Sequence, residues 1–164
     1  MRRFVGKRLP IETLQQPALC LAFAYWREKR GDRTFPSRKD IAPEEMRTYL
    51  ANVMLVEVAR QPLDFVYRVF GSGIAAAHGE DYTNKSVRDL QPPEFAALIW
   101  DQYADVLEKE TPQLHGVVFQ TESQYHEYQR LTLPLSSNGV TIDKLLAVSI
   151  EDRDFWDTVA KAAR

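Results

Sequence analysis

Apolar residues recur at helical spacing in three stretches of the chain. From Leu14 to Arg30 they predict an amphipathic helix that ends at Gly31. From Asp40 to Leu50 they predict a short second helix with Asp40 as its N-cap. From Pro92 to Glu110 they predict the clearest helix of the chain, which Thr111-Pro112 ends. A brief helix over residues 74–78 and a tail helix over residues 155–164 complete the helical pattern.

Five runs rich in β-branched and aromatic residues predict strands. Short turns join the first two runs and the last two, and the second of these turns contains Asn138-Gly139. Hairpin-linked strands on either side of helices predict an α+β fold with an antiparallel sheet. The runs are Val53 to Val58, Phe65 to Phe70, Leu114 to Thr121, Tyr128 to Leu135 and Lys144 to Ile150.

Length and charge narrow the class of protein. The chain has 164 residues, enough for one domain with a substantial core, and a formal net charge of −2. This balance argues against a dedicated nucleic-acid-binding protein, which usually carries a basic face. The single cysteine, Cys20, excludes an internal disulfide framework. No signal peptide or membrane span is recognisable, so we expect a cytoplasmic protein.

Several short motifs occur together in one order. They are Tyr25-Trp26-Arg27, then residues 35–43 (Phe-Pro-Ser-Arg-Lys-Asp-Ile-Ala-Pro), then residues 65–74 (Phe-Val-Tyr-Arg-Val-Phe-Gly-Ser-Gly-Ile), then residues 131–136 (Leu-Thr-Leu-Pro-Leu-Ser) before Asn138-Gly139. This set resembles the small bacterial PAS family catalogued as PAS_5. The resemblance covers about residues 20 to 150.

The resemblance implies a stand-alone sensory fold with a curled five-stranded sheet and helices around a small cavity. We expect a helical extension over residues 1–50, a PAS core over 51–153 and a tail over 154–164. Many PAS domains end their last strand with an Asp-Ile-Thr-like signal, whereas residues 150–153 here read Ile-Glu-Asp-Arg. We therefore expect any signal to leave through a noncovalent partner.

The expected cavity lies between the sheet and the segment from Ile74 to Tyr103. The candidate polar ligand contacts are Arg68 and His115. The candidate wall residues are Tyr67, His78, Phe95, Ile99, Tyr103, Val117, Phe119 and Leu133.

Arg68 sits in a strand whose two faces are both largely apolar. Alternation places Phe65, Tyr67 and Val69 on one face, and Val66, Arg68 and Phe70 on the other. A buried guanidinium needs an acceptor, which could be an anionic ligand or an internal partner. For Arg68 we favour a salt bridge to Glu57 or Asp81 over an anionic ligand. Arg130 poses the same choice between a ligand and an internal partner.

Other motifs indicate little chemistry. Residues 71–76 (Gly-Ser-Gly-Ile-Ala-Ala) match a phosphate-binding pattern, but the following helix is too short and no parallel strand follows it. We favour a tight strand-to-helix corner. His78, His115 and His126 have no metal-ligand spacing, so no metal is expected. His78 or His115 could contact a ligand or haem iron, although a hydrogen-bonded wall residue is the more common role. Cys20 lies within a helix and lacks the setting of a reactive thiol.

The first helix carries an apolar stripe formed by Leu14, Leu21, Tyr25 and Trp26. Such a stripe must be buried, either on the open face of the sheet or against the same helix of a second subunit. The second arrangement would give a symmetric homodimer.

Together these features predict a cytoplasmic PAS regulator in bacterial signal transduction, without catalysis of its own. It would bind a small molecule of unknown identity, a signalling protein, or both. Two alternatives stay open. A small cavity enzyme would need His115 with Glu57 or Asp81 as its acid–base pair, and a pure interaction scaffold would have an interior filled with large side chains.

Overall fold

A six-stranded sheet forms the centre of the protein in a computed structural model that describes residues 3–164. Its strand order is β1-β4-β5-β6-β2-β3, and every neighbouring pair is antiparallel. The α+β class and the five predicted strands are therefore confirmed. The strands are β1 (Arg3–Leu9), β2 (Val53–Ala59), β3 (Asp64–Phe70), β4 (Gln113–Gln120), β5 (Tyr125–Leu135) and β6 (Lys144–Ser149).

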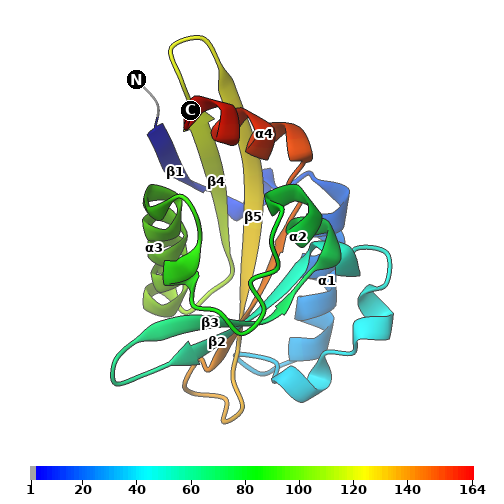
Figure 1. Ribbon diagram of the computed structural model, residues 1–164. Coiled ribbons are helices and arrows are strands. Elements are labelled where there is room, and N and C mark those ends of the chain that lie inside the picture. The colour runs from blue at the N-terminus through cyan, green and yellow to red at the C-terminus, as the bar shows by residue number, and fades with distance from the viewer. Residues whose placement is uncertain (1–2) are drawn as a thin grey trace.

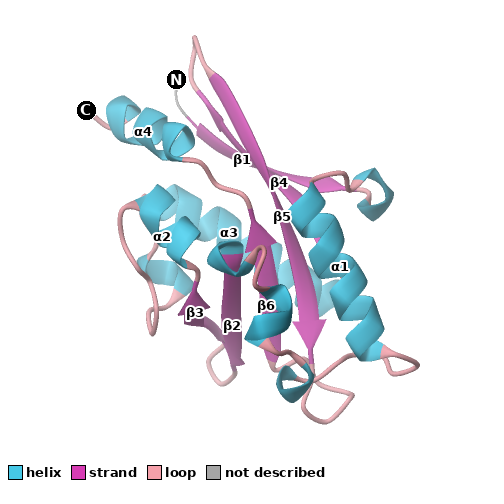
Figure 2. Cartoon of the chain, turned by 90° about the vertical axis from the view of Figure 1, so that its right-hand side faces the viewer, coloured by secondary structure: helices cyan, strands magenta, loops and turns pink. Residues whose placement is uncertain are grey.

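Helices cover both faces of this sheet (Figure 2). Helix α1 lies on one side, which we call the outer face, and helices α2 and α3 lie on the other, the inner face. The fourth helix, α4, follows β6. The helices are α1 (Pro17–Arg30), α2 (Ser72–His78), α3 (Pro93–Lys109) and α4 (Arg153–Ala162). None of the helices in residues 3–164 has the length and apolar character that crossing a membrane requires.

Helix α1 buries its apolar stripe against its own sheet. The indole Nε1 of Trp26 donates a hydrogen bond to the carbonyl oxygen of Pro134 in β5, at 2.8 Å. Leu21, expected in this stripe, is instead 53% exposed, whereas Leu19 is fully buried. The first of the two expected uses of the stripe is therefore the one observed within the chain.

The predicted second helix is wrong, because residues 38–52 form only short 3-10 turns. Asp40 does not begin a helix; its carboxylate accepts a hydrogen bond from the backbone N–H of Ser37 and closes one turn. The N–H of Ala42 donates to the Tyr25 hydroxyl of α1 at 2.9 Å, not to a helical carbonyl. The turns follow the surface of α1 instead of extending away from it.

Strand β1 was not predicted from the sequence. It pairs with β4 from Arg3↔Gln120 to Leu9↔Leu114 and forms one edge of the sheet (Figure 1). Its residues are mostly exposed, so they show no alternation between apolar and polar positions. Phe4 is the exception, because its ring packs 4.9 Å from that of Phe119 and 5.4 Å from that of Phe95.

A β-bulge changes the expected faces of β3. Leu55 pairs with Val69 but Val56 pairs with Tyr67, so Arg68 has no partner residue in β2. The extra residue rotates the strand, and Phe70 joins Tyr67 on the inner face, with ring centroids 5.0 Å apart. The assignment of Phe70 to the face of Arg68 is therefore wrong.

The glycine-rich corner after β3 is shaped by close packing. A Cβ atom at Gly71 would collide with the backbone carbonyl of Ala51. Only glycine lets the two backbones approach so closely. The helix that follows, α2, has seven residues and ends at Gly79, whose φ of 84° is left-handed. This geometry agrees with the tight corner that the sequence favours.

Candidate functional site

The space between the inner face and helices α2 and α3 is filled by large side chains. All seven of the expected wall residues other than Leu133 are buried and point into this space from β3, β4, α2 and α3. They are Tyr67, His78, Phe95, Ile99, Tyr103, Val117 and Phe119, which are 0–2% exposed as whole residues except for His78, whose side chain is 5% exposed.

Leu133 does not line this interior. It lies three positions from Arg130 along β5, and alternate residues of a strand face opposite sides. Arg130 contacts α3 on the inner face, so Leu133 lies on the outer face, which α1 covers. Alternation along a strand assigns residues to the correct face only when the face of one residue is already known.

Arg130 is the central polar residue of the interior. It is 1% exposed. Its Nη1 donates to Oε1 of Gln102 at 3.1 Å, and its Nη2 donates to the Tyr128 hydroxyl at 3.3 Å. The same Nη2 lies 3.6 Å from Oε2 of Glu151, which makes a buried ion pair. Burial disfavours the charged guanidinium, but the surrounding hydroxyls and carboxylate outweigh this effect and keep the pKa of Arg130 raised.

Glu151 connects Arg130 to two helices. Its Oε1 lies 2.7 Å from Nε2 of His78 in α2 and accepts a hydrogen bond from Nε1 of Trp156 in α4 at 3.2 Å. Its Oε2 accepts from the Ser149 hydroxyl at 2.6 Å. Burial alone would raise the pKa of the Glu151 carboxyl, but these donors and Arg130 lower it to about 2. The carboxylate is therefore held in its charged form.

Two tyrosine hydroxyls meet beside this ion pair. The oxygens of Tyr67 and Tyr103 lie 3.1 Å apart, one from β3 and one from α3. Burial raises the pKa of both hydroxyls, so both stay protonated at neutral pH. The guanidinium of Arg130 lies 5.9 Å from the centre of the Tyr103 ring.

Two side-chain polar atoms of β5 in this interior have no hydrogen-bond partner among the described residues. They are Nε of Arg130 and the hydroxyl oxygen Oγ1 of Thr132. Both residues are on the inner face of β5, two positions apart. Buried polar groups are nearly always hydrogen-bonded, so these two atoms are exceptions among the buried polar groups of the interior.

Arg68, expected among apolar neighbours, is exposed on the other side of the sheet. Its Nε donates to Oε2 of Glu57 at 2.5 Å, and its Nη1 donates to Asn84 at 3.1 Å. Alternation along β3, which is an edge strand, places Arg68 on the face opposite Tyr67. The salt bridge to Glu57 that the sequence favours is present, but at the surface, so Arg68 is not a polar contact of the interior.

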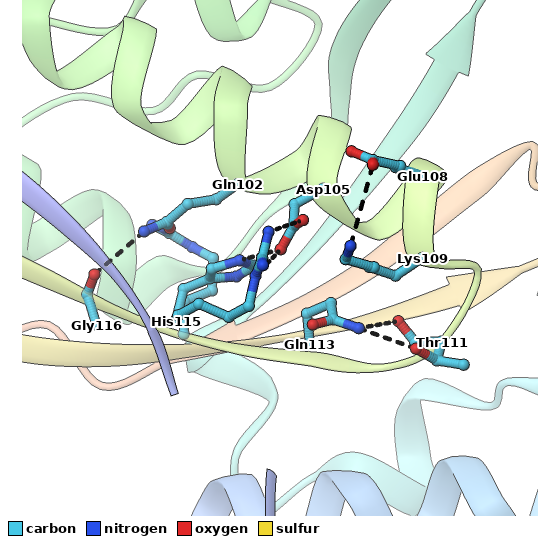
Figure 3. Close-up of polar contacts among 10 residues, drawn as sticks. Gln102, Asp105, Glu108, Lys109, Thr111, Gln113, His115 and Gly116 are labelled. Atoms are coloured by element: carbon cyan, nitrogen blue, oxygen red, sulfur yellow. Dashed lines mark hydrogen bonds and ion pairs between the residues drawn. The ribbon is translucent and has the colours of Figure 1, made fainter. Parts of the chain in front are cut away.

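His115 lies at the end of the interior, beside helix α3 (Figure 3). Its Nε2 is 2.9 Å from Oδ2 of Asp105, which also accepts two hydrogen bonds from Arg8 of β1. Burial lowers the pKa of His115 below its usual value despite this carboxylate, which favours the neutral ring. Figure 3 also shows Gln102, whose amide donates to the Gly116 carbonyl at 3.1 Å.

The enzyme alternative needs His115 to be paired with Glu57 or Asp81, and this prediction is wrong. Glu57 is paired with Arg68 at the surface, and Asp81 accepts hydrogen bonds from the backbone and hydroxyl of Thr83. Neither acid contacts His115. Among the described residues no group of three or more metal-binding side chains occurs, and Cys20 is exposed.

Sequence reasoning missed three members of the interior cluster: Glu151, Gln102 and Trp156. Each lies in a segment whose placement depends on the sheet. Glu151 follows β6 after one intervening residue, Ile150, and a lone acid just after a mostly apolar strand is the one signal that could have indicated it. Trp156 was assigned to a tail, but it packs 4.7 Å from the ring of Phe95.

Several solved structures match the chain, and two of them are light-oxygen-voltage (LOV) domains. One is a light-oxygen-voltage domain described with a flavin analogue, with a TM-score of 0.49, 16% identity, and coverage of 73% of this chain and 91% of that one. The other is the dark structure of the LOV domain of the blue-light photoreceptor Aureochrome1, with a TM-score of 0.47, 15% identity, and coverage of 72% and 88%. No curated protein matches the chain.

A family model for the PAS domain, PAS_5, matches residues 14–149. The match spans most of the chain and includes all of the sheet except β1, together with α1, α2 and α3. The chain therefore belongs to the PAS domain family PAS_5.

Proposed function

We propose that this protein is a regulatory PAS domain that binds a small polar ligand beside Arg130 and signals through helix α4. The observation that carries this function is the fully buried ion pair of Arg130 and Glu151. Buried ion pairs generally add little stability compared with apolar packing, so another role has to account for one. Recognition of a polar ligand inside a signalling domain is such a role.

The unpartnered atoms define the chemistry of the ligand. Nε of Arg130 is a hydrogen-bond donor, and the Thr132 hydroxyl can donate or accept. Glu151 already balances the charge of Arg130. We therefore infer a small neutral or singly negative molecule with an oxygen acceptor.

The route of the signal follows from the contacts of Glu151. A ligand that draws the guanidinium of Arg130 towards itself weakens the ion pair with Glu151. The same carboxylate holds Trp156 of α4 and His78 of α2. Ligand binding would then shift the population between docked and released α4, provided that the two states bind the ligand with different affinity. The released helix, or the surface beneath it, would meet the signalling partner.

Native mass spectrometry of the purified protein, compared with the denatured protein, tests the ligand. We expect an excess mass that is lost on denaturation. Thr132→Val removes the buried hydroxyl with little change of shape and should lose the excess mass. Thr141→Val, at an exposed position, should keep it. A wild-type spectrum with only the mass of the chain, or full retention in Thr132→Val, contradicts a ligand at this site.

One observation favours a second candidate function. Phe95, Tyr103 and Trp156 pack closely in the interior, and such filling suits a protein-interaction domain that binds no ligand. That domain would give only the mass of the chain in the same experiment. Pairing of two chains would then have to use the exposed side of α1, where Leu21 lies, because the other side is already buried. Neither function assigns catalysis to the chain, and both suit a cytoplasmic bacterial regulator.

A further inference from the structure

A surface groove of about 710 Å³ runs between strand β1 and helix α3. We propose that this groove docks an extended segment of a partner protein that carries lysine or arginine, and that the segment pairs with the free edge of β1. This docking surface extends the proposed regulatory function but does not depend on the interior ligand. The residues that bear on the argument are Gly6 and Arg8 of β1, Glu94, Asp101 and Asp105 of α3, and His115 of β4.

The edge of β1 is open to another strand. Within residues 3–164, β1 pairs only with β4 and lies at one end of the sheet. The opposite edge, β3, is protected: the N–H of Tyr67 donates to the Lys85 carbonyl, and the N–H of Asn84 donates to the Tyr67 carbonyl. An uncovered edge presents a row of free N–H and C=O groups. Extended peptides bind to such edges by adding a strand.

An ion pair joins the two walls of the groove. Nε and Nη2 of Arg8 donate to the Asp105 carboxylate at 3.1 and 2.5 Å, which ties β1 to α3. Gly6 allows close approach nearby, since a Cβ there would lie 3.2 Å from Nε2 of Gln102. His115 borders the groove with a side chain only 5% exposed, and its Nδ1 has no partner among the described residues. Walls that are already joined require less reordering when a segment binds.

The α3 wall of the groove is acidic. Arg8 and His115 neutralise Asp105, but Glu94 and Asp101 are exposed and form no hydrogen bond or ion pair in the described part of the chain. They lie seven residues apart, so they share one face of the helix. Alternate side chains of an added strand point the same way, about 7 Å apart. Seven residues of a helix span about 10 Å, and long lysine or arginine side chains can cover this difference and lie beside both acids.

A second copy of this chain fits the edge poorly. Strand β1 carries Arg3, Lys7 and Arg8, so two β1 edges in contact would bring like charges together. Natural proteins use such charges to prevent edge-to-edge association. A partner segment with cations towards α3 avoids this repulsion because its charges face Glu94 and Asp101.

Fluorescence anisotropy with synthetic peptides tests the docking surface on the full chain. The probe is a labelled heptapeptide of alternating lysine and valine. One comparison peptide replaces lysine with glutamate, and another is N-methylated at alternate residues, which removes the backbone donors of one edge. We expect saturable binding of the lysine peptide alone, with chemical shift changes in β1 by NMR.

Charge-reversal variants locate the site. Glu94→Lys combined with Asp101→Lys should weaken binding of the lysine peptide by about tenfold or more, since two attractive pairs become repulsive. Glu44→Lys, at an exposed position in the turns beside α1, should leave it unchanged. Absence of saturable binding, equal binding of the N-methylated peptide, or an equal effect of Glu44→Lys would overturn the docking surface. Concentration-dependent dimerisation abolished by Arg8→Glu would assign the edge to a second copy instead. The mass measurement tests the interior ligand, and the peptide measurement tests the docking surface. Failure of one proposal is therefore distinguishable from failure of the other.

Discussion

At the scale of single residues, variants of the Arg130–Glu151 ion pair show whether the pair serves ligand binding or the stability of the fold. Arg130→Met breaks the buried ion pair and leaves the Glu151 carboxylate with His78, Ser149 and Trp156 alone, which should cost about 3 kcal/mol of unfolding free energy. Adding Glu151→Gln removes both charges and keeps the shape of the cluster. We expect the double variant to recover most of the loss, as measured by urea denaturation.

The single variants are the controls for this cycle. If the ion pair exists for ligand recognition, the double variant is folded and stable but retains no excess mass in native spectra. A double variant as unstable as Arg130→Met would show instead that the charges hold the fold together. The ion pair would then have a structural role and no role in ligand binding.

The charge of Glu151 also predicts a pH dependence. Its pKa is about 2 in the folded protein, below its ordinary value of 4.5. The stabilisation is therefore complete above pH 4.5 and is lost as the pH falls towards 2, by about 3 kcal/mol in total. The wild type should lose more unfolding free energy over this range than the double variant.

His115 provides an internal check on that measurement. Burial lowers its pKa, so protonation destabilises the folded state as the pH falls below 6.5. Both proteins contain His115 and should share this earlier loss. Identical curves below pH 4.5 would contradict the assignment of the acid-sensitive step to Glu151.

At the scale of elements, strand β1 is an integral part of the fold although the family model begins after it. Phe4 contacts the rings of Phe95, Phe119 and Trp156 at centroid distances of 4.9–6.5 Å. Because it is only partly buried, Phe4→Ala should lower the unfolding free energy by about 2 kcal/mol in urea. Arg3→Ala, at the exposed end of β1, should change it by less than about 0.5 kcal/mol. Equal effects would mean that β1 only rests on the surface.

The elements that could be predicted from the sequence are those with a strong apolar period. Helix α3 and strands β2 to β6 bury one or both faces, so their patterns persist in the sequence. Strand β1 is half exposed and shows no pattern. Residues 38–52 bury apolar side chains through turns, whose spacing imitates a helix. The bulge at Arg68 reversed the expected face of Phe70, because a single added residue shifts the alternation.

The candidate site was predictable only in part, for the same reason. The aromatic wall residues follow from periodicity within β3, β4 and α3. Glu151 joins the cluster through tertiary packing across the sheet, and the only local sign of this is a lone acid just after a mostly apolar strand. Arg130 could be identified as a buried cation, but its partner could not.

At the scale of the whole molecule, the two ends of the chain meet over the interior site. Strand β1 and helix α4 both lie outside the family match, and the rings of Phe4 and Phe155 are 6.4 Å apart. Figure 1 shows α4 beside the start of β1 at one end of the sheet. Glu151 lies two residues before α4 and contacts the buried Arg130. A change at Arg130 can therefore reach the molecular surface through one side chain.

Hydrogen exchange of the α4 amides tests this coupling most directly. The double variant Arg130→Met/Glu151→Gln replaces a charge-assisted bond to Trp156 with a neutral one, a loss of about 1 kcal/mol. The account predicts that α4 amides exchange about fivefold faster than in the wild type, while amides of β5 keep their protection. Exchange of α4 at the wild-type rate, in a folded double variant, would contradict a signal that passes from the interior to this helix.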